Sequence, residues 1–541
     1  MLGELVVALW LLASENQYTT LVVAATVLAA YKLVIYPFFL SPLKNIPGPY
    51  LYRISAIPAL ENQRKHQWIK TVHALHAKYG EVVVLLPTAI SCSGDSKYIQ
   101  DIYVKNMPKL KFYEHFRNHG FRDNMFASLE NDRHIRYKRM VQNLYLKSAV
   151  FSPKNSTREN IVAKVEQLVN QPKDKSLAID VYSLFGSLAM DVVSAFELGV
   201  KNGTDLLLHP TKRLILVPHR LQAGMVFWTT LMPRFWDWAA GDNVKAASKE
   251  IEEWQLNLYG NAEKNVPKFE EDENWTTLET FKKNGLLGKN AYSFLSDNIF
   301  AGHETTAIQL TYLTYELSRP VNRYRQAILR KELVEAFGKP GSTPISDLDR
   351  LDKLPYLEAL LQENSRVHSS IPGGEPRVVP KEYKVQIGKK SVAVPVGTTI
   401  SCQPYLMHRV ESVFPNPDAW LPERWLQKED ETDVAYKARM TAMQRYMMPF
   451  GKGVRMCLGM NVALIEMKAA LANLYWRFES DISADWCQIT KYDSNTKAGN
   501  NIGLGSHYMV SDSDESMMTM MDSYTTRPYY DECWLEWLEA E

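Results

Sequence analysis

The chain has 541 residues and a mass of 62.0 kDa, which is long enough to bury a large core. Its 62 basic and 61 acidic side chains leave a net charge of +1, so no overall field favours nucleic acid as a partner. The five cysteines lie far apart and no Cys-x-x-Cys pair occurs, which argues against a zinc ribbon or an iron–sulfur cluster. Free thiols in a reducing compartment are the simplest interpretation.

The N-terminus departs from this soluble composition. Residues 18–40 are apolar except for Lys32, and this run is long enough to cross a bilayer. Basic residues follow the apolar run, whereas Glu4 and Glu15 precede it, so the positive-inside rule predicts an anchor with the remaining chain in the cytosol. A cleaved signal peptide is the alternative, but it would need an early basic region, and no basic residue precedes Lys32. Prolines at 41–49 predict a stiff hinge after the anchor.

Several segments follow the hinge. Residues 81–86 and a second short run near Ile90 predict a β-hairpin. Basic residues crowd a predicted helix at about 130–145, where a solvated helix face is the ordinary explanation. The segment 206–240 is apolar and rich in tryptophan and phenylalanine. Buried helix core is the first explanation for that segment, and contact with a membrane interface is the second.

A long helix is predicted over residues 289–319, and Ala-Gly-His-Glu-Thr-Thr occupies its middle at 301–306. Glycine inside a helix costs about 1 kcal/mol relative to alanine, so its presence needs a reason. Ala301, Gly302 and Thr305 share one helix face, where two small residues open a gap beside a hydroxyl group. Such a face suits a diatomic molecule and the protons that it needs. A zinc-protease motif is excluded because position 307 is Ala rather than His.

Another helix is predicted from near Leu354, and it carries Glu363 and Arg366 one turn apart. On a surface helix such a pair contributes little to stability. Residues 383–400 read as short strands separated by glycine- and proline-containing turns. The tail from Ser511 is acidic and rich in methionine, and it carries no recognisable functional pattern.

A glycine-punctuated loop, Phe-Gly-Lys-Gly-Val-Arg-Met-Cys-Leu-Gly at 450–459, leads directly into a helix predicted from Leu458 to Trp476. Cys457 therefore lies at a helix N-terminus, where free amide groups and the helix dipole favour a thiolate. The glycines allow the backbone to approach a flat group, and Arg455 can pair with an anion. A lone cysteine is usually a small buried hydrophobe, but this set of residues suits a haem iron and its propionates.

The pattern Phe-x-x-Gly-x-Arg-x-Cys-x-Gly would arise by chance in roughly one chain of this length in ten thousand. It resembles the haem-ligand loop of the cytochrome P-450 monooxygenases and matches it at every defining position. The resemblance implies that Cys457 is the proximal ligand of haem b, a thiolate that pushes electron density toward oxygen. Residues 301–306 resemble the oxygen-activating segment of the same family, and 41–49 resemble the hinge of its microsomal, in particular fungal, members.

The resemblance also implies roles for other residues. Thr305 and Glu304 are implied to be catalytic, because they guide protons to the oxygen. His134 and Lys138 match a family pattern of an aromatic residue or His followed four positions later by a basic residue, both of which reach a haem propionate. Arginine is commoner than lysine at the second position, and Arg139 is an alternative to Lys138. The implied cofactor-binding residues are Cys457, Arg455, Arg377, Phe450, His134, Lys138, Ala301 and Gly302.

A structural trio is implied behind the haem. Glu363 and Arg366 form the Glu-x-x-Arg pair of the family, and Arg424 in Pro-Glu-Arg-Trp joins them. Trp425 stands where the family usually has Phe.

The fold implied is mainly helical, the cytochrome P-450 fold with a small β lobe, on a single N-terminal transmembrane helix. Its expected parts are a lumenal segment at 1–17, the anchor at 18–40, the hinge at 41–49 and the catalytic domain at 50–541. The chemistry implied is insertion of one atom of dioxygen into a small apolar substrate, while the second atom is reduced to water.

Electrons have to come from a partner, because the chain has neither a dinucleotide-binding Gly-x-Gly-x-x-Gly after a strand nor a P-loop. The resemblance implies an NADPH–cytochrome P-450 reductase in the endoplasmic reticulum membrane, with cytochrome b5 as an optional second donor. Basic residues near the cysteine loop are expected to form the docking face: Arg133, Arg136, Arg445 and Lys452.

Two other functions stay open. A haem-thiolate isomerase or dehydratase would need no reductase, but such members often lose the acid–alcohol pair, which is intact here at Glu304 and Thr305. A non-catalytic haem-binding sensor belongs to a different class. Oxygen uptake with NADPH and reductase separates both from a monooxygenase.

Overall fold

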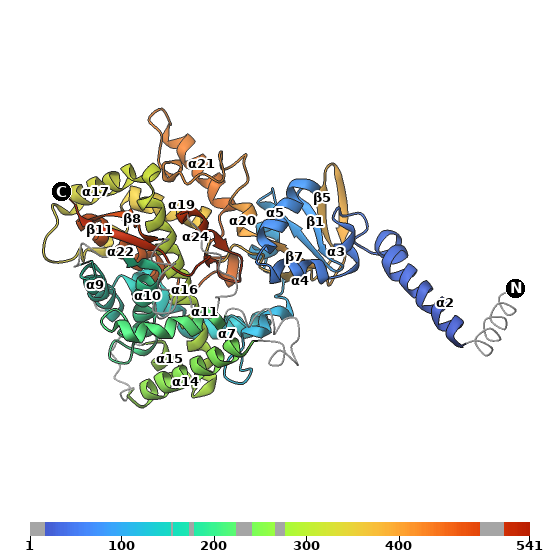
Figure 1. Ribbon diagram of the computed structural model, residues 1–541, viewed down its shortest axis with the longest axis horizontal. Coiled ribbons are helices and arrows are strands. Elements are labelled where there is room, and N and C mark those ends of the chain that lie inside the picture. The colour runs from blue at the N-terminus through green and yellow to red at the C-terminus, as the bar shows by residue number, and fades with distance from the viewer. Residues whose placement is uncertain are drawn as a thin grey trace. The chain divides into compact units, whose positions relative to one another are not determined.

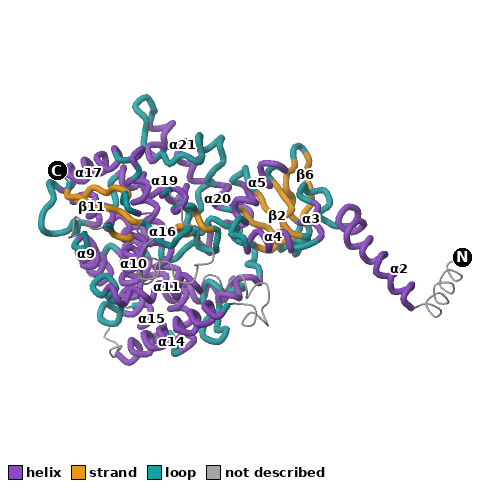
Figure 2. Tube along the Cα trace, in the orientation of Figure 1, coloured by secondary structure: helices purple, strands orange, loops and turns teal. Residues whose placement is uncertain are grey.

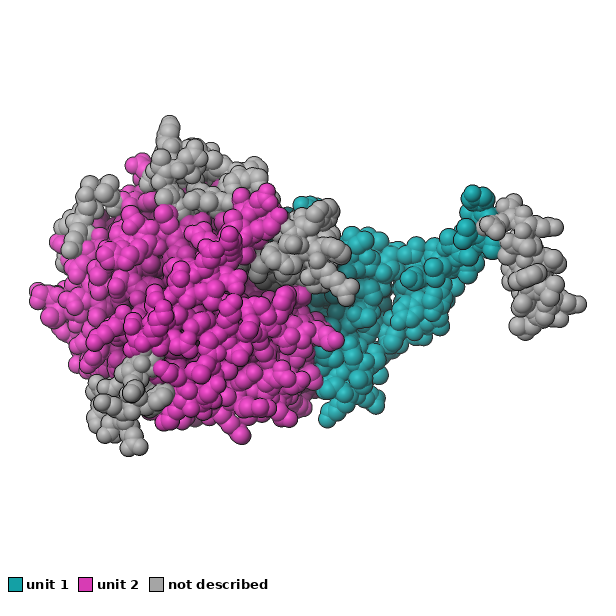
Figure 3. All heavy atoms as spheres, turned by 90° about the horizontal axis from the view of Figure 1, so that it is seen from below, with its two compact units in different colours: residues 1–94, 375–402 teal, residues 95–374, 403–541 magenta. Residues whose placement is uncertain are grey.

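The computed structural model describes residues 17–152, 155–172, 178–222, 241–265, 276–486 and 513–540. It divides into two compact units (Figure 3): unit 1 is Met1–Gly94 with Glu375–Cys402, and unit 2 is Asp95–Gly374 with Gln403–Glu541. Helices predominate in unit 2, whereas strands form the centre of unit 1 (Figure 2). The expectation of a mainly helical protein with a small β component is confirmed. The first 16 residues and the aromatic region at 223–240 lie outside the described residues.

The N-terminal apolar run is helical, as α2 (Gln17–Ala30) followed by a π-helical stretch, η1 (Tyr31–Leu40). Residues Tyr18–Leu40 are long and apolar enough to cross a membrane, and this helix, whose first part is labelled α2 in Figure 1, is almost entirely exposed. Val181–Leu198 passes the same test of length and composition, but 89% of that window is buried, as in the core helix of a soluble domain.

The end of the apolar helix is tied to the residues that follow the hinge. Pro37 lies inside η1 and removes one backbone donor from it. The hydroxyl of Tyr50 donates a hydrogen bond to the carbonyl of Leu33 at 2.7 Å, one turn before the proline. The Tyr50 ring also stacks on Phe38, with centroids 5.3 Å apart. Tyr50 thus supplies a hydrogen-bond donor and an apolar surface where the helix geometry is irregular.

Unit 1 is built around a four-stranded sheet of order β1-β2-β7-β4. β1 and β2 are antiparallel, with Val82 opposite Cys92, which confirms the predicted hairpin. β2 and β7 are parallel, with Cys92 opposite Cys402. A separate hairpin, β5 with β6, turns at Gly388, whose φ of 58° favours glycine. The elements are α3 (Tyr50–Ile54), α4 (Ile57–Arg64), α5 (Trp68–Tyr79), β1 (Val82–Leu86), β2 (Ala89–Cys92), β4 (Arg377–Val378), β5 (Tyr383–Ile387), β6 (Lys390–Val394) and β7 (Thr399–Cys402).

Unit 2 consists mostly of helices, and the long helices predicted from the sequence are present in it. The longer ones are α7 (Asn131–Val141), α9 (Ser156–Val169), α10 (Val181–Leu198), α14 (Asp242–Asn265), α16 (Lys289–Ser318), α17 (Tyr324–Phe337), α19 (Pro355–Val367), α21 (Asp433–Tyr446) and α22 (Met460–Arg477). The shorter ones are α6 (Lys97–Ile99), η2 (Gln100–Val104), η3 (Lys111–Phe116), η4 (Gln142–Tyr145), α8 (Lys147–Val150), η5 (Pro210–Ile215), α11 (Leu216–Gln222), α15 (Thr277–Lys283), η6 (Pro320–Asn322), α18 (Leu348–Leu351), α20 (Pro404–Met407), η7 (Pro422–Trp425), η8 (Gly453–Arg455) and α24 (Asp514–Met517).

The C-terminal tail, which carried no pattern in the sequence, is part of the folded core of unit 2. β11 (Trp534–Glu539) is the central strand of a sheet of order β3-β11-β8, between β3 (Ile179–Asp180) and β8 (Phe478–Ile482). A second small sheet pairs β9 (Met520–Met521) with β10 (Arg527–Pro528). The side chains of Cys533, Leu535 and Trp537 belong to the main hydrophobic core.

Helices α10 and α16 form the centre of that core, and both are buried along most of their length. Gly302 lies where they touch. A Cβ atom at position 302 would be 2.6 Å from Cγ2 and 3.1 Å from Cβ of Val193 on α10. Close packing of two helices therefore explains this glycine, and the expectation that it serves to open a gap for a ligand is not needed to account for it.

We expect Gly302→Ala to destabilise the protein. Alanine gains about 1 kcal/mol in helix propensity, but overpacking against the stiff Val193 side chain costs about 1–3 kcal/mol. Gly260 is the matched control, because it also lies inside a helix, α14, yet its Cβ would meet only Tyr292 Oη at 4.0 Å. Gly260→Ala should raise the midpoint of chemical unfolding, whereas Gly302→Ala should lower it. A higher midpoint for Gly302→Ala would show that the two helices have room to separate.

Candidate functional site

The cysteine loop is folded back on itself ahead of α22. The amide N–H of Cys457 donates to the carbonyl of Phe450 at 2.8 Å, and that of Met456 donates to Gly453 at 3.1 Å. The Phe450 side chain packs against the main core. These bonds hold Cys457 three residues before the start of α22 at Met460.

Gly453 lets the cysteine loop pack directly on protein backbone. Gly453 has a φ of 71°, which a residue with a side chain rarely adopts. A Cβ atom at position 453 would lie 2.3 Å from the carbonyl oxygen of Tyr103, so the loop packs directly on the backbone of η2. The expectation that loop glycines allow approach to a flat group is therefore not needed for Gly453. The Tyr103 carbonyl oxygen belongs to the backbone, so it could not rotate away from a side chain at position 453.

Cys457 is the accessible thiol of the described residues. Cys92, Cys402 and Cys533 are buried, and none of these four cysteines forms a disulfide. Although the Cys457 side chain has accessible surface, the protein atoms packed around its sulfur remove part of its water, and this desolvation raises the pKa of the thiol. The backbone amides of Gly459 and Met460 and the charge of Lys138 act in the opposite direction. The net direction differs from the sequence expectation, because desolvation outweighs the helix N-terminus. Bonding to a metal ion would supply the missing stabilisation, since a coordinated thiol is deprotonated outright.

Cationic side chains surround the loop. The guanidinium of Arg455 donates to the carbonyls of Ser128 at 2.7 Å and Leu129 at 3.1 Å. The ammonium of Lys138, on α7, donates to the carbonyl of Val454 at 2.9 Å. Lys138 is thus joined to the cysteine loop, whereas the alternative residue Arg139 is exposed.

His134 lies one turn before Lys138 on α7 and is buried. Its Nδ1 atom has no hydrogen-bond partner among the described residues. Burial and, to a smaller extent, the nearby positive charges of Arg455, Lys109 and Lys138 together lower the pKa of His134 to about 3. A buried imidazole with an unsatisfied nitrogen inside a positive cluster fits an anionic group, which would satisfy the nitrogen and offset the charge. The residues present therefore fit the carboxylates of a haem.

Two residues of this region were not singled out from the sequence. Lys109 is buried, and its ammonium lies 4.0 Å from the ring centroids of both Tyr113 and Phe126. Asp297 lies on α16 one turn before Ala301. Burial raises the pKa of Asp297 to about 7, against the opposing effects of Lys109 and the Phe126 amide. Asp297 could have been singled out from the sequence because it precedes Ala301 by four residues on the predicted helix. Nothing in the sequence around Lys109 marks Lys109 as part of this region.

The side chains of residues 301–306 divide between two faces of α16. Ala301 is exposed and Thr305 is half-buried, within a helix that is otherwise mostly buried. The Thr305 hydroxyl donates to the carbonyl of Ala301 at 2.7 Å, so its proton is engaged within the helix while its oxygen can still accept a hydrogen bond. Glu304 is buried and accepts a hydrogen bond from the hydroxyl of Tyr182, on α10, at 2.7 Å. The alcohol and the acid are thus adjacent in sequence but face different surroundings.

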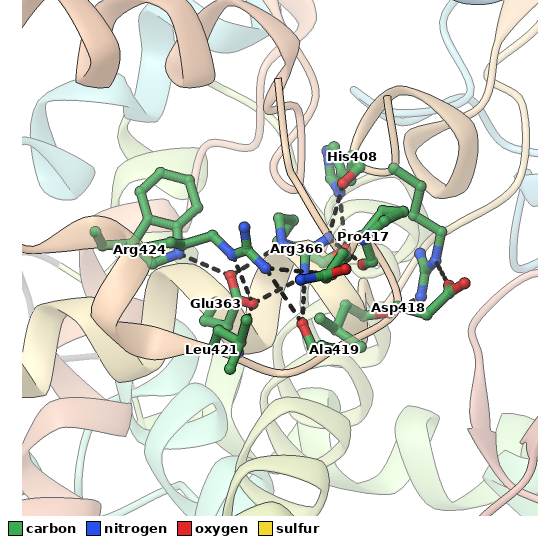
Figure 4. Close-up of polar contacts among 12 residues, drawn as sticks. Glu363, Arg366, His408, Pro417, Asp418, Ala419, Leu421 and Arg424 are labelled. Atoms are coloured by element: carbon green, nitrogen blue, oxygen red, sulfur yellow. Dashed lines mark hydrogen bonds and ion pairs between the residues drawn. The ribbon is translucent and has the colours of Figure 1, made fainter. Parts of the chain in front are cut away.

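Glu363, Arg366 and Arg424 form one buried network (Figure 4). Arg366 donates two hydrogen bonds to the Glu363 carboxylate at 2.8 and 2.9 Å, and Arg424 donates a third at 3.0 Å. Neither Glu363 nor Arg366 has accessible side-chain surface, so this is not the weak surface pair of the ordinary explanation. Trp425 adds a bond from Nε1 to Glu363 at 2.9 Å, which phenylalanine could not make.

Arg377 belongs to unit 1, where it begins β4 and is buried. Its guanidinium pairs with Glu375 at 3.3 Å and donates to the carbonyl of Pro376 at 3.1 Å. The other residues predicted for the site lie in unit 2.

Comparison with known proteins identifies the family of the chain. The profile of the family described as cytochrome P450 matches residues 47–502. The chain is 28% identical over 483 residues to cytochrome P450 monooxygenase hkm5 of Aspergillus hancockii, which covers 82% of this chain and 86% of the relative. It is 24% identical over 475 residues to cytochrome P450 monooxygenase FGM1 of Gibberella zeae, covering 84% and 88%. Because the profile spans most of the chain, the protein belongs to the cytochrome P450 family.

Proposed function

We propose that the protein inserts one atom of dioxygen into a small apolar organic substrate, with haem b held through the Cys457 thiolate. The observation that carries the proposal is the accessible Cys457 thiol beside a positive cluster that contains an unsatisfied, buried His134. The family implies a haem iron with a cysteine ligand. Relatives named as monooxygenases support the reaction class, and their low identity gives no information on the substrate.

The protein side chains divide the work of holding the cofactor. Cys457 would bind the iron, and Arg455, Lys138 and His134 would bind the propionates by charge and hydrogen bonds. We include Arg377 of unit 1 in this set because it occupies the matching position of the family pattern. When bound, haem supplies the binding and cleavage of dioxygen. Since the family match runs through both units, we treat residues 50–541 as one catalytic domain.

Ala301, Glu304 and Thr305 are proposed to serve the oxygen side of the haem, and Gly302 to let α16 pack closely on α10 beside them. The small side chain of Ala301 leaves space, and the lone pairs of the Thr305 hydroxyl can accept a hydrogen bond from a proton donor or a water molecule. The Glu304 carboxyl can resupply protons. Neither Thr305 nor Glu304 has to touch the substrate.

Electrons are proposed to come from an NADPH–cytochrome P-450 reductase, with cytochrome b5 as an optional second donor. Among the residues expected on the docking face, Arg136 and Arg445 are exposed. Arg445 and Lys452 line a surface depression together with Gln444 and Met440. Arg133 is partly neutralised by ion pairs with Asp123 and Glu130, so it offers less charge to a partner.

The exposed apolar helix at Tyr18–Leu40 supports a single-pass anchor in the endoplasmic reticulum membrane. The charge asymmetry around it supports a cytosolic catalytic domain.

The ligand role of Cys457 is tested by the spectrum of the reduced protein with carbon monoxide. The wild type should show the absorption band diagnostic of thiolate-ligated haem, and Cys457→Ala should lose it because no sulfur ligand remains. Cys533→Ala, which removes a buried thiol from unit 2, is the control and should retain the band. Survival of the band in Cys457→Ala would place the ligand elsewhere.

The anchor is tested by deleting residues 1–40. Loss of the apolar helix should release much of the protein from microsomes, although the aromatic residues at 227–238 are expected to retain a fraction. With the full-length chain in sealed microsomes, added protease should digest most of the protein. Complete protection of the catalytic domain would mean that the orientation is reversed.

The Thr305 hydroxyl is tested with Thr305→Ala in the presence of reductase and NADPH. Haem content should persist, while a larger share of the NADPH consumed appears as hydrogen peroxide, because proton delivery to oxygen is impaired. Thr311→Ala is the matched control, since Thr311 makes the same 2.7 Å bond to the carbonyl four residues earlier but is fully buried. An unchanged peroxide share in Thr305→Ala would leave Thr305 with the ordinary role of bonding its own helix.

A further inference from the structure

Glu304 lies between a hydrogen-bond donor and a hydrogen-bond acceptor. Its Oε1 atom accepts from the hydroxyl of Tyr182 at 2.7 Å. Its Oε2 atom lies 3.7 Å from Nε2 of His303. All three side chains are buried in unit 2. The properties of the two neighbours decide what this arrangement can do.

His303 presents an acceptor to Glu304. Its Nδ1 atom lies 2.8 Å from the carbonyl of Ile299, which can only accept, so Nδ1 carries the ring proton. Burial and the nearby Arg220, against the opposing bond to the Ile299 carbonyl, lower the pKa of His303 to about 4, so the ring is neutral near pH 7. Nε2 therefore has a lone pair, and it has no hydrogen-bond partner among the described residues.

Tyr182 presents a fixed donor. Burial raises the pKa of Tyr182 well above its ordinary value, and the nearby Glu304 raises it further, against the opposing charge of Arg220. The phenol therefore keeps its proton throughout the working range of an enzyme. It orients the carboxyl group and does not relay protons as a phenolate.

The remaining charged groups around this site hold Tyr182 in place. The guanidinium of Arg220, on α11, lies 4.0 Å from the centroid of the Tyr182 ring. The same guanidinium donates to the carbonyl of Asp531 at 3.2 Å, and Asp531 forms an ion pair with Arg527 at 2.6 Å. His219 of α11 lies edge-on to His303, with centroids 5.0 Å apart. The C-terminal segment thus supports the Arg220–Tyr182 stack.

We propose that Tyr182 and His303 form a two-sided cradle around the Glu304 carboxyl, which binds and releases one proton. Tyr182 is thereby a positioning residue for proton supply to the Thr305 side of α16. This inference rests on the proposed monooxygenase function. When the carboxyl O–H bond breaks and its proton passes to a water molecule, the carboxylate keeps the bond from Tyr182. When a proton from water is taken up again, the new O–H faces His303 Nε2, which is 3.7 Å away, and donates to it once the carboxyl moves closer. The bond from Tyr182 persists in both states, so the carboxyl always keeps one partner, whose loss would be costly for a buried group.

The test is a double-mutant cycle of Tyr182→Phe and Glu304→Gln. Phenylalanine keeps the ring under Arg220 and removes only the hydroxyl. Tyr312→Phe is the matched control. The Tyr312 hydroxyl, on α16, is buried like that of Tyr182 but has no hydrogen-bond partner among the described residues. All variants are purified with haem, and the carbon monoxide band is recorded first.

The first readout is chemical unfolding, which does not depend on turnover. Tyr182→Phe should increase the unfolding equilibrium constant on the order of tenfold, and less than that in the Glu304→Gln background. Tyr312→Phe should leave it unchanged or lower. Equal effects of Tyr182→Phe in both backgrounds would overturn the cradle.

The second readout is the share of NADPH recovered as hydrogen peroxide with reductase and no added substrate. Tyr182→Phe should raise this share in the wild-type background and leave it unchanged in the Glu304→Gln background. If Tyr182→Phe does not fold, His303→Leu, which removes the acceptor together with the bond to the Ile299 carbonyl, should give the same pattern of peroxide shares in the two backgrounds. Additive effects in both backgrounds would overturn the proposal, while absence of the carbon monoxide band in the wild type would instead refute the haem-thiolate function.

Discussion

The close contact between α10 and α16 is the constraint on which the oxygen side of the site depends. Val193 of α10 leaves no room for a side chain at Gly302. On one side of that contact Tyr182 bonds to Glu304 at 2.7 Å, and on the other Asn298 bonds to Glu197 at 3.1 Å. The contacting residues advance along α10 as they recede along α16, so the helices run in opposite senses where they touch. This packing turns the accessible surfaces of Ala301 and Thr305 away from α10.

The two charged clusters of unit 2 differ in how well they are satisfied. Around Glu363 the carboxylate receives bonds from Arg366, Arg424, Trp425 and the amide of Leu421, so a buried charge is stabilised entirely by protein. The positive cluster at the cysteine loop is different, because His134 keeps an unsatisfied nitrogen among Arg455, Lys109 and Lys138. Full satisfaction is what a structural network requires, and an excess of positive charge with an open nitrogen fits a site for an anionic ligand.

Periodicity and breakers predicted the elements well, because α16, α19 and α22 are long, amphipathic or buried, and bounded by prolines or glycines. The cysteine loop was readable for a different reason: its spacing is too demanding to arise by chance. The sequence could not predict contacts between distant segments. Tyr182 and Glu304 are 122 residues apart in the sequence. Arg220, which stacks on Tyr182, contacts Asp531 of the C-terminal tail only in the folded protein. The sequence predicted the amides that favour a Cys457 thiolate, but it did not predict that desolvation outweighs them and raises the pKa of the thiol. Desolvation depends on surrounding atoms that no local pattern reveals.

The central claim is that the protein presents Cys457 to an iron centre, and X-ray absorption at the iron edge of the purified holo-protein tests it most directly. Iron held by this loop should show one sulfur neighbour beside the porphyrin nitrogens, because Cys457 is the accessible thiol of the described residues. Only nitrogen or oxygen neighbours around the iron would contradict the account.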